Sequence, residues 1–249
     1  MEKLTGKYGL PLEVQFCKKC TMNNQRPSST VEFKQKADEK KRTLIFGADG
    51  ICEACRYAEQ KKSINWDDRH KELEELCNRF RRSDGRYDVV VPGSGGKDSV
   101  QAAHILKYKY NMNPILITWP PALYTDIGRR NFDAWLDAGF ANYTYNQNKK
   151  LHRFLTKNAF LNLGHPFQPF ILGQKNLAPR LSVLLDIPLV VFGENEAEYG
   201  NAIADNEKPT RDPKYYSAEV SIKDLILGGI PAKDLIDDFG FKLSDLEAY

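Results

Sequence analysis

One segment limits the fold of this chain more than any other. The apolar, largely β-branched run Tyr87–Pro92 leads directly into the glycine-rich loop of residues 93–96. A short run of this kind is typical of a strand that is buried on both faces of a parallel sheet. The residues that follow, Ser99–Tyr110, have the apolar spacing of a helix. Because parallel strands need a crossover connection, usually a helix, this segment predicts a βαβ unit.

The rest of the sequence repeats this alternation. We expect further strands at residues 114–119, 142–145 and 188–193, and helices at about 126–139, 148–160 and 168–185. The tail, residues 220–249, also has a helical pattern. Of the 249 residues 41% are hydrophobic, which is enough for a sizeable core and excludes wholesale disorder. Together these patterns predict an α/β fold: a parallel sheet with helices on both faces.

The loop after the first predicted strand, Pro92-Gly-Ser-Gly-Gly-Lys-Asp-Ser99, has the composition of an anion-binding site. Glycines let main-chain N–H groups converge on an anion, and the following helix adds the positive end of its dipole. Its spacing matches neither GxxxxGK[ST] nor GxGxxG. A purely structural turn is the alternative to phosphate binding. The residues expected to bind the phosphates are Gly93, Ser94, Gly95, Gly96, Lys97, Asp98 and Ser99.

Two charged side chains in this loop receive separate roles. Lys97 adds positive charge beside the phosphates. Asp98 would repel a phosphate directly, so we expect it to hold a Mg²⁺ ion that bridges phosphates. Both are therefore candidate catalytic residues.

Four of the five cysteines form two CxxC pairs, Cys17 with Cys20 and Cys52 with Cys55. Two such pairs can complete the tetrahedral coordination of Zn²⁺. A redox or iron–sulfur site, or four unrelated buried cysteines, are the alternatives. Zinc closed by four thiolates has no open position, so we expect a structural role. The fifth cysteine, Cys77, falls in a helical pattern and is expected in the core.

The two kinds of motif divide the chain. We predict a zinc-binding module at residues 1–62 and a nucleotide-binding domain at residues 63–249. The charged run of residues 34–42, between the CxxC pairs, is expected to be a solvated loop. An amphipathic helix at 66–82 would open the second domain.

Charge and hydropathy exclude several classes of protein. No run of about 18 apolar residues is present, and the N-terminal segment has no apolar core of a secretory signal. We therefore expect a cytoplasmic protein without a membrane partner. Residues 1–86 carry 19 basic and 14 acidic side chains, or +5, against −2 for the remainder. This mildly basic module is weaker than a nucleic-acid footprint usually requires.

The segment Ser94-Gly-Gly-Lys-Asp-Ser99 resembles the PP-loop of the N-type ATP pyrophosphatases, an adenine nucleotide alpha hydrolase-like fold. The resemblance implies that ATP is split to AMP and pyrophosphate. By family position, Thr118 and Trp119 lie where adenosine is recognised; Trp119 would stack on the base or be a core indole. Residues 193–196 would meet the loop at the carboxyl edge of the sheet. There Gly193 and Asn195 would contact the nucleotide, and Glu194 would hold Mg²⁺, position the nucleophile, or be a surface carboxylate.

A narrower resemblance covers nearly the whole chain from residue 17. The chain is similar to the N-acetyl sugar amidotransferase family (the WbpG, PseA and LegG type). The similarity lies in Cys17-Lys-Lys-Cys-Thr-Met-Asn-Asn24, in Gly50-Ile-Cys-Glu-Ala-Cys55, and in the segments 164–174 and 193–196. These enzymes act in bacterial surface-sugar biosynthesis, on precursors of lipopolysaccharide O-antigen and of pseudaminic or legionaminic acid. The resemblance implies adenylation of an acetamido group and replacement of its oxygen by ammonia, giving an acetamidino sugar. Because family members extend past residue 249, we expect either a truncated C-terminal part or a naturally short enzyme.

The distribution of cysteines bears on the nucleophile. No cysteine follows Cys77, which argues against sulfur transfer and against glutamine hydrolysis within this chain. The resemblance implies that ammonia comes from a separate glutaminase, like that of imidazole glycerol phosphate synthase, with a cyclase-like companion. Two alternatives stay open: a tRNA-modifying enzyme of the thiolation type, and a non-catalytic zinc-ribbon interaction protein.

Overall fold

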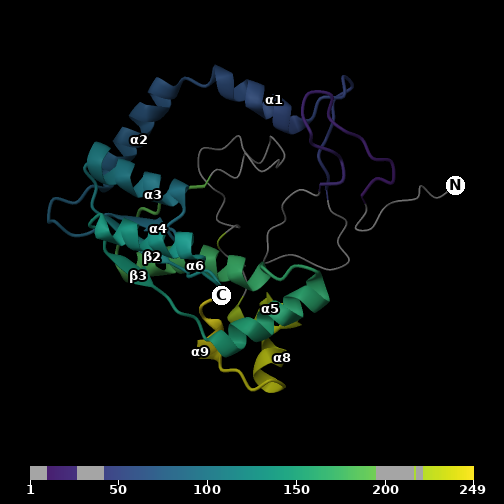
Figure 1. Ribbon diagram of the computed structural model, residues 1–249. Helices are drawn as coiled ribbons and strands as arrows, with labels where there is room; N and C mark the ends of the chain where they lie inside the picture. The colour runs from purple at the N-terminus through teal and green to yellow at the C-terminus, as the bar shows by residue number, and fades with distance from the viewer. Residues whose placement is uncertain (1–9, 27–41, 195–215, 217–220) are drawn as a thin grey trace. The chain divides into compact units, whose positions relative to one another are not determined.

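The computed structural model describes residues 10–26, 42–194, 216 and 221–249 (Figure 1). The chain divides into two compact units. The first unit comprises residues 1–66 and 195–215, and the second comprises residues 67–194 and 216–249. In the described part of the chain, no helix combines the length and the apolar character needed to cross a membrane.

The first unit has little regular secondary structure before its helices. Two isolated antiparallel bridges, Phe16 with Asn23 and Phe46 with Cys52, close its turns. They are followed by α1 (Glu53–Gln60) and a turn of 3-10 helix, η3 (Lys61–Ser63). Most of the charged run predicted as a solvated loop, residues 34–41, lies outside the described residues.

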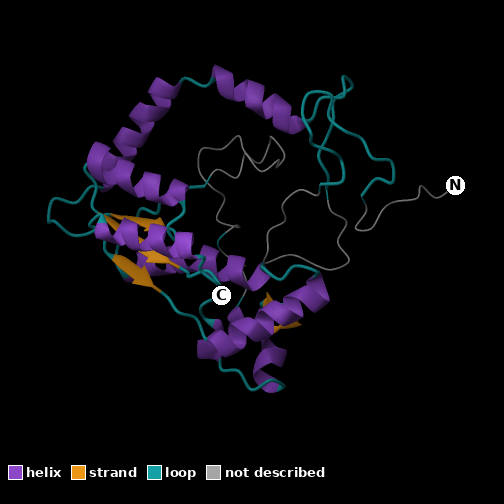
Figure 2. Cartoon of the chain, viewed as in Figure 1, coloured by secondary structure: helices purple, strands orange, loops and turns teal. Residues whose placement is uncertain are grey.

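The second unit contains a parallel sheet in the order β1-β2-β3, drawn as arrows in Figure 2. Its strands are β1 (Val89–Pro92), β2 (Pro114–Thr118) and β3 (Asn142–Thr144). The strand predicted at 188–193 is reduced to one parallel bridge between Val190 and Val90. Two hydrogen bonds make it: Val90 N–H to the Leu189 carbonyl, and Val191 N–H to the Val90 carbonyl, both 2.9 Å. This segment therefore lies at the edge of β1 opposite β2.

The helices of the second unit fall on both faces of this sheet. They are α2 (Trp66–Phe80), α3 (Lys97–His104), the π-helical η4 (Ile105–Lys109), α4 (Asp126–Asp137), α5 (Lys149–Leu163) and α6 (Gln168–Leu184). Val91 and Leu116 share a core with Ala103 of α3 and Trp135 of α4. Ile117, the next residue of β2, points to the opposite face, which α6 contacts. The predicted α/β class with a parallel sheet is confirmed.

The tail corrects one prediction, because it is not helical throughout. After η7 (Ile222–Asp224), β4 (Ile226–Leu227) and β5 (Ile230–Pro231) form a hairpin, followed by α8 (Ala232–Asp237) and α9 (Leu243–Leu246). Gly228 and Gly229 make its turn with φ of +61° and +76°. Such angles favour glycine and suit a two-residue hairpin. The buried Gln168 side chain holds the turn by accepting from Gly228 N–H at 3.0 Å and donating to the Ile226 carbonyl.

Candidate functional sites

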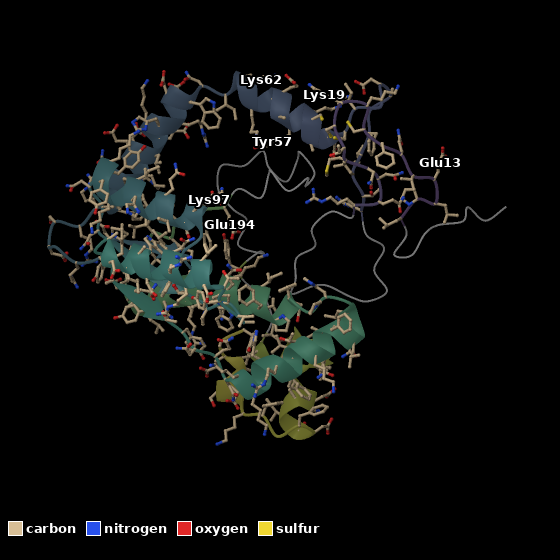
Figure 3. The ribbon with its side chains drawn as sticks, viewed as in Figure 1. Glu13, Lys19, Tyr57, Lys62, Lys97 and Glu194 are labelled. Carbon is tan, nitrogen blue, oxygen red and sulfur yellow. The ribbon has the colours of Figure 1, made fainter. Side chains whose placement is uncertain are left out.

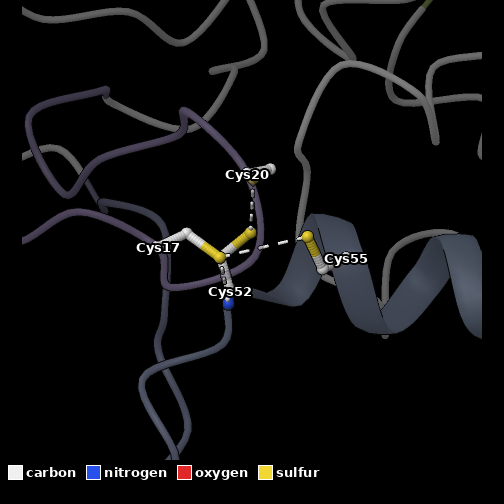
Figure 4. A group of neighbouring side chains, drawn as sticks. All are labelled: Cys17, Cys20, Cys52 and Cys55. Atoms are coloured by element: carbon white, nitrogen blue, oxygen red, sulfur yellow. Dashed lines mark hydrogen bonds between the residues drawn. The ribbon is translucent and has the colours of Figure 1, made fainter.

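The four paired cysteines meet in one cluster in the first unit (Figure 4). All four sulfur atoms lie within 4.8 Å of one another. The Cys17 and Cys55 sulfurs are 3.9 Å apart, and those of Cys20 and Cys52 are 3.7 Å apart. A tetrahedral Zn²⁺ with bonds of about 2.3 Å sets its sulfurs about 3.8 Å apart. The cluster fits a metal ion such as zinc, as the CxxC spacing predicts.

Main-chain turns bring the two cysteine pairs together. The first pair lies in a turn closed by Cys17 N–H donating to the Met22 carbonyl at 2.8 Å. Gly50, with φ of +77°, turns the chain before the second pair and accepts from Lys18 N–H at 3.1 Å. Cys52 is the N-cap residue of α1 and Cys55 lies in its first turn. One sulfur pair therefore comes from a loop and the other from a helix start.

Hydrogen bonding and burial give these thiols different acidities. Burial raises the pKa of Cys17, but main-chain N–H groups outweigh it and lower that pKa to about 6. Two of these donors, Cys52 N–H and Lys19 N–H, lie 3.3 and 3.4 Å from its sulfur. Burial raises the pKa of Cys52, and raises that of Cys55 to about 12. A metal must therefore displace the protons of Cys52 and Cys55, whose raised pKa keeps them neutral without it, so its binding is coupled to pH.

The glycine-rich loop joins β1 to α3 in the second unit. Gly95 has φ of +93°, and a Cβ atom there would lie 2.8 Å from the main-chain nitrogen of Phe132. Gly96 is the N-cap residue of α3 and has open space where a Cβ would be. The main-chain N–H groups of Ser94, Gly95 and Gly96 have no acceptor among the described residues. Three consecutive N–H groups beside a helix N-terminus form a suitable cradle for an anion.

The polar side chains of the loop are arranged at its outer edge. Lys97 and Asp98 are exposed and pair with each other at 2.7 Å, from Nζ to Oδ1. The Ser99 hydroxyl donates to the Gly96 carbonyl at 3.0 Å, so it also contributes to the start of α3. The charged pair is accessible to a ligand, while the serine is partly committed to the fold.

The segment after Val190 reaches the same loop. A Cβ atom on Gly193 would lie 2.6 Å from Ser99 N and 2.7 Å from the Asp98 carbonyl, so Gly193 packs directly on the first turn of α3. Glu194 is exposed, and Figure 3 labels it together with Lys97. The structure thus brings residues 193 and 194 to the glycine-rich loop. Asn195 lies outside the described residues.

Strand order explains why these segments meet. The connections from β1 to β2 and from β2 to β3 run through α3 and α4, on one face. The chain then passes through α5 and α6 and returns to the other edge of β1. The order therefore reverses beside β1, and ligands of open α/β sheets bind at the carboxyl edge of such a reversal.

At the end of β2, Thr118 and Trp119 are buried. The Thr118 hydroxyl donates to the Gly93 carbonyl at 2.7 Å and accepts from the Asn142 amide at 2.8 Å. The Trp119 ring stacks on Tyr145 with centroids 5.6 Å apart, and its Nε1 has no partner in the described part of the chain. Both side chains belong to the packing behind the loop. That either one contacts adenosine stays a prediction.

A hollow adjoins the glycine-rich loop on the α6 face of the sheet. Its lining includes Gly93 and Ser94 of the loop, Trp119 directly after β2, and Gln174 and Leu177 of α6. The contribution of α6 is a tertiary contact that no local pattern indicates. The hollow places the Gln174 amide side chain close to the glycine-rich loop.

Comparisons with known proteins are sparse. No protein-family model matches the chain. Over 77 residues, 31% of its length, the chain is 32% identical to the uncharacterized protein MJ1599 of Methanocaldococcus jannaschii. The match spans 27% of that protein's own length. The chain is thus similar to part of a protein that has no assigned activity.

Proposed function

We propose that this protein is an ATP-dependent, AMP-forming amidotransferase that converts an acetamido group of a sugar or nucleotide sugar into an acetamidino group. It would be a PP-loop enzyme of the N-acetyl sugar amidotransferase family. The observation that carries the proposal is the sequence Ser94–Ser99 in its structural position. It follows a parallel strand, opens α3 and lies where the strand order reverses. Its main-chain N–H groups at residues 94–96 have no acceptor within the described parts of the chain.

The loop residues would divide the work of binding ATP. The N–H groups of Ser94, Gly95 and Gly96 would hold phosphate oxygens, and Lys97 would stabilise the charge that develops on the leaving pyrophosphate. Asp98 and Glu194 supply exposed carboxylates, the oxygen ligands that Mg²⁺ prefers. Bound Mg²⁺ would neutralise phosphate charge.

The proposed reaction has two steps. The acetamido oxygen attacks the α-phosphorus of ATP, the α–β anhydride bond breaks, and pyrophosphate leaves. Ammonia then adds to the activated carbon, loses a proton, and the carbon–oxygen bond to AMP breaks to give the amidine. An amide carbonyl is a poor electrophile until its oxygen carries a leaving group, which is why ATP is needed.

The source of ammonia would be a second protein. Downstream of Cys77 the sequence contains no cysteine to serve as a glutaminase nucleophile or to carry sulfur. A glutaminase like that of imidazole glycerol phosphate synthase, with a cyclase-like companion, would supply it. The four-cysteine cluster would hold Zn²⁺ through Cys17, Cys20, Cys52 and Cys55 and stabilise the first unit without taking part in the chemistry.

The test is an assay with ATP, Mg²⁺, ammonium and a panel of nucleotide-linked diacetamido sugars. Mass spectrometry should detect AMP and a sugar in which NH replaces one oxygen. Asp98→Ala should lower turnover by on the order of 100-fold or more, without changing the melting temperature, because Asp98 is exposed. Asp133→Ala is the matched control: it removes a partly exposed aspartate that pairs with Arg129 on α4, and should keep full activity.

The products separate the alternatives. ADP in place of AMP would contradict adenylation. Copurifying RNA whose affinity falls steeply with salt would favour the tRNA-modifying alternative. Absence of any ATP binding would favour the non-catalytic interaction protein.

A further inference from the structure

The start of the glycine-rich loop is tied to β2 by two hydrogen bonds at one residue. Gly93 N–H donates to the Ile117 carbonyl at 3.0 Å, and the Gly93 carbonyl accepts from the Thr118 hydroxyl at 2.7 Å. The first is an ordinary sheet bond. The second comes from a side chain, so it depends on the residue type at position 118.

The second bond fixes the orientation of the next peptide plane. In a trans peptide the carbonyl of one residue and the N–H of the next point in opposite directions. Because the Gly93 carbonyl points to Thr118, the Ser94 N–H points away from β2. That N–H has no acceptor among the described residues, so its direction decides whether the loop presents a donor to an anion. A flip of this plane would rotate ψ of Gly93, which glycine permits, together with φ of Ser94, which a serine side chain resists. The Thr118 hydrogen bond is therefore a restraint that acts in addition to the sterics of Ser94.

The Thr118 hydroxyl is itself held in place by β3. The Asn142 amide donates to the Thr118 oxygen at 2.8 Å, and the Thr144 hydroxyl donates to the Asn142 oxygen at 2.6 Å. The Thr118 side chain is fully buried. With its oxygen accepting from Asn142, the hydroxyl proton is directed at the Gly93 carbonyl. The three groups donate in one direction, an arrangement in which each hydrogen bond strengthens the next.

We propose that Thr118, supported by Asn142, is a positioning residue that locks the Gly93–Ser94 peptide with its N–H toward the bound anion. Loss of the Thr118 hydroxyl removes one restraint on this peptide, so its carbonyl turns toward the anion in a larger fraction of molecules and replaces attraction by repulsion. The inference rests on the proposed function in one respect: the loop must bind a phosphate group.

The test compares four proteins with two probes. Wild type, Thr118→Val, Thr118→Ser and Thr156→Val are titrated by calorimetry with inorganic pyrophosphate and with ATP and Mg²⁺. Thr156 is the matched control because its hydroxyl donates to the His152 carbonyl at 2.8 Å within α5, away from the loop. We expect Thr118→Val to weaken both ligands by about tenfold, the effect of one hydrogen bond. Thr118→Ser should restore wild-type affinity, and Thr156→Val should keep it.

A measurement without ligand keeps the two proposals apart. The carbon-13 resonance of the Gly93 carbonyl should move in Thr118→Val and hold its position in Thr118→Ser. If wild type binds both probes but Thr118→Val binds them equally well, the positioning role is wrong and the proposed function stands. If wild type binds neither probe, the proposed function is overturned and the role of Thr118 in ligand binding falls with it.

Discussion

The cysteine cluster and the glycine-rich loop are built from different parts of the polypeptide. The cluster presents four side-chain sulfurs within 4.8 Å, and each sulfur is a specific ligand for soft metal ions. The loop presents main-chain N–H groups and two exposed charged side chains. Side-chain ligands therefore identify the class of ion, whereas N–H groups identify only the sign of charge. This is why geometry alone identifies the class of metal ion at the cysteine cluster but does not identify a nucleotide at the loop.

The two sites also differ in what holds them together. The cysteine cluster has only a small core among the described residues, in which Leu44, Met22 and Phe46 pack on the cysteines. The glycine-rich loop is wedged into a core: a Cβ atom on Gly93 would lie 2.9 Å from the Trp135 ring, and one on Gly95 would meet Phe132. The first site should need its ligand to fold, and the second should keep its shape without one.

The largest effect should follow loss of the metal. Cys52→Ser removes one of four ligands, so we expect the zinc content to fall to background and the first unit to lose its fold. Structural zinc contributes on the order of 10 kcal/mol to such modules. Metal analysis and hydrogen exchange of residues 42–60 measure the change, while exchange protection of β1 and β2 should persist.

The control for this variant is Cys77→Ala. Cys77 is fully buried in the core of the second unit and is not part of the cluster. Its substitution should cost about 1 kcal/mol and leave the zinc content unchanged. If Cys52→Ser kept the metal, or if chelation left residues 42–60 protected, the contrast between the two sites would be lost.

The next effect tests the packing of the loop through two adjacent glycines. Gly95→Ala places a Cβ atom 2.8 Å from the main chain of Phe132 at a φ of +93°, so we expect a loss of about 2–4 kcal/mol in the free energy of unfolding. Gly96→Ala meets open space at a φ of −68° and should cost about 1 kcal/mol or less. Urea denaturation of both variants measures the difference. Equal stabilities would show that the loop is not wedged against α4.

Local sequence patterns predict both sites for the same reason. The CxxC spacing and the strand–glycine–helix succession each lie within a few residues, so their geometry is set by short-range turns and caps. The helix predicted at 99–110 is present from Lys97, although residues 105–109 are π-helical. The predicted strand at 188–193 pairs through Val190 alone, because pairing depends on a distant partner.

What the sequence does not reveal depends on contacts between distant segments. The hairpin at Gly228 and Gly229 is held by Gln168, which is 60 residues away, and a helical pattern in the tail hides it. The role of the Thr118 hydroxyl is equally invisible, since a threonine at the end of a strand is also an ordinary strand residue. Its partner Asn142 comes from the third strand, so only the assembled sheet brings the two together.

The smallest effect should come from an exposed carboxylate of the first unit, and it completes the comparison with Asp98. The Glu59 side chain pairs with Lys19 and with Lys62, the latter at 2.8 Å. The hydrogen bond from Lys19 is the largest cause that lowers the pKa of Glu59, from 4.5 to about 2. Because this pKa is depressed, ionised Glu59 stabilises the folded state at pH values above the unfolded pKa, and this stabilisation is lost as pH falls from 4.5 toward 2.

Solvent screens exposed pairs, so Glu59→Gln should shift the melting temperature only slightly at neutral pH. Zinc content should stay at the wild-type level, because Glu59 is not one of the four clustered ligands. Loss of zinc in this variant, measured by metal analysis, would mean that the cluster depends on nearby surface charge, as the glycine-rich loop is proposed to depend on Lys97 and Asp98.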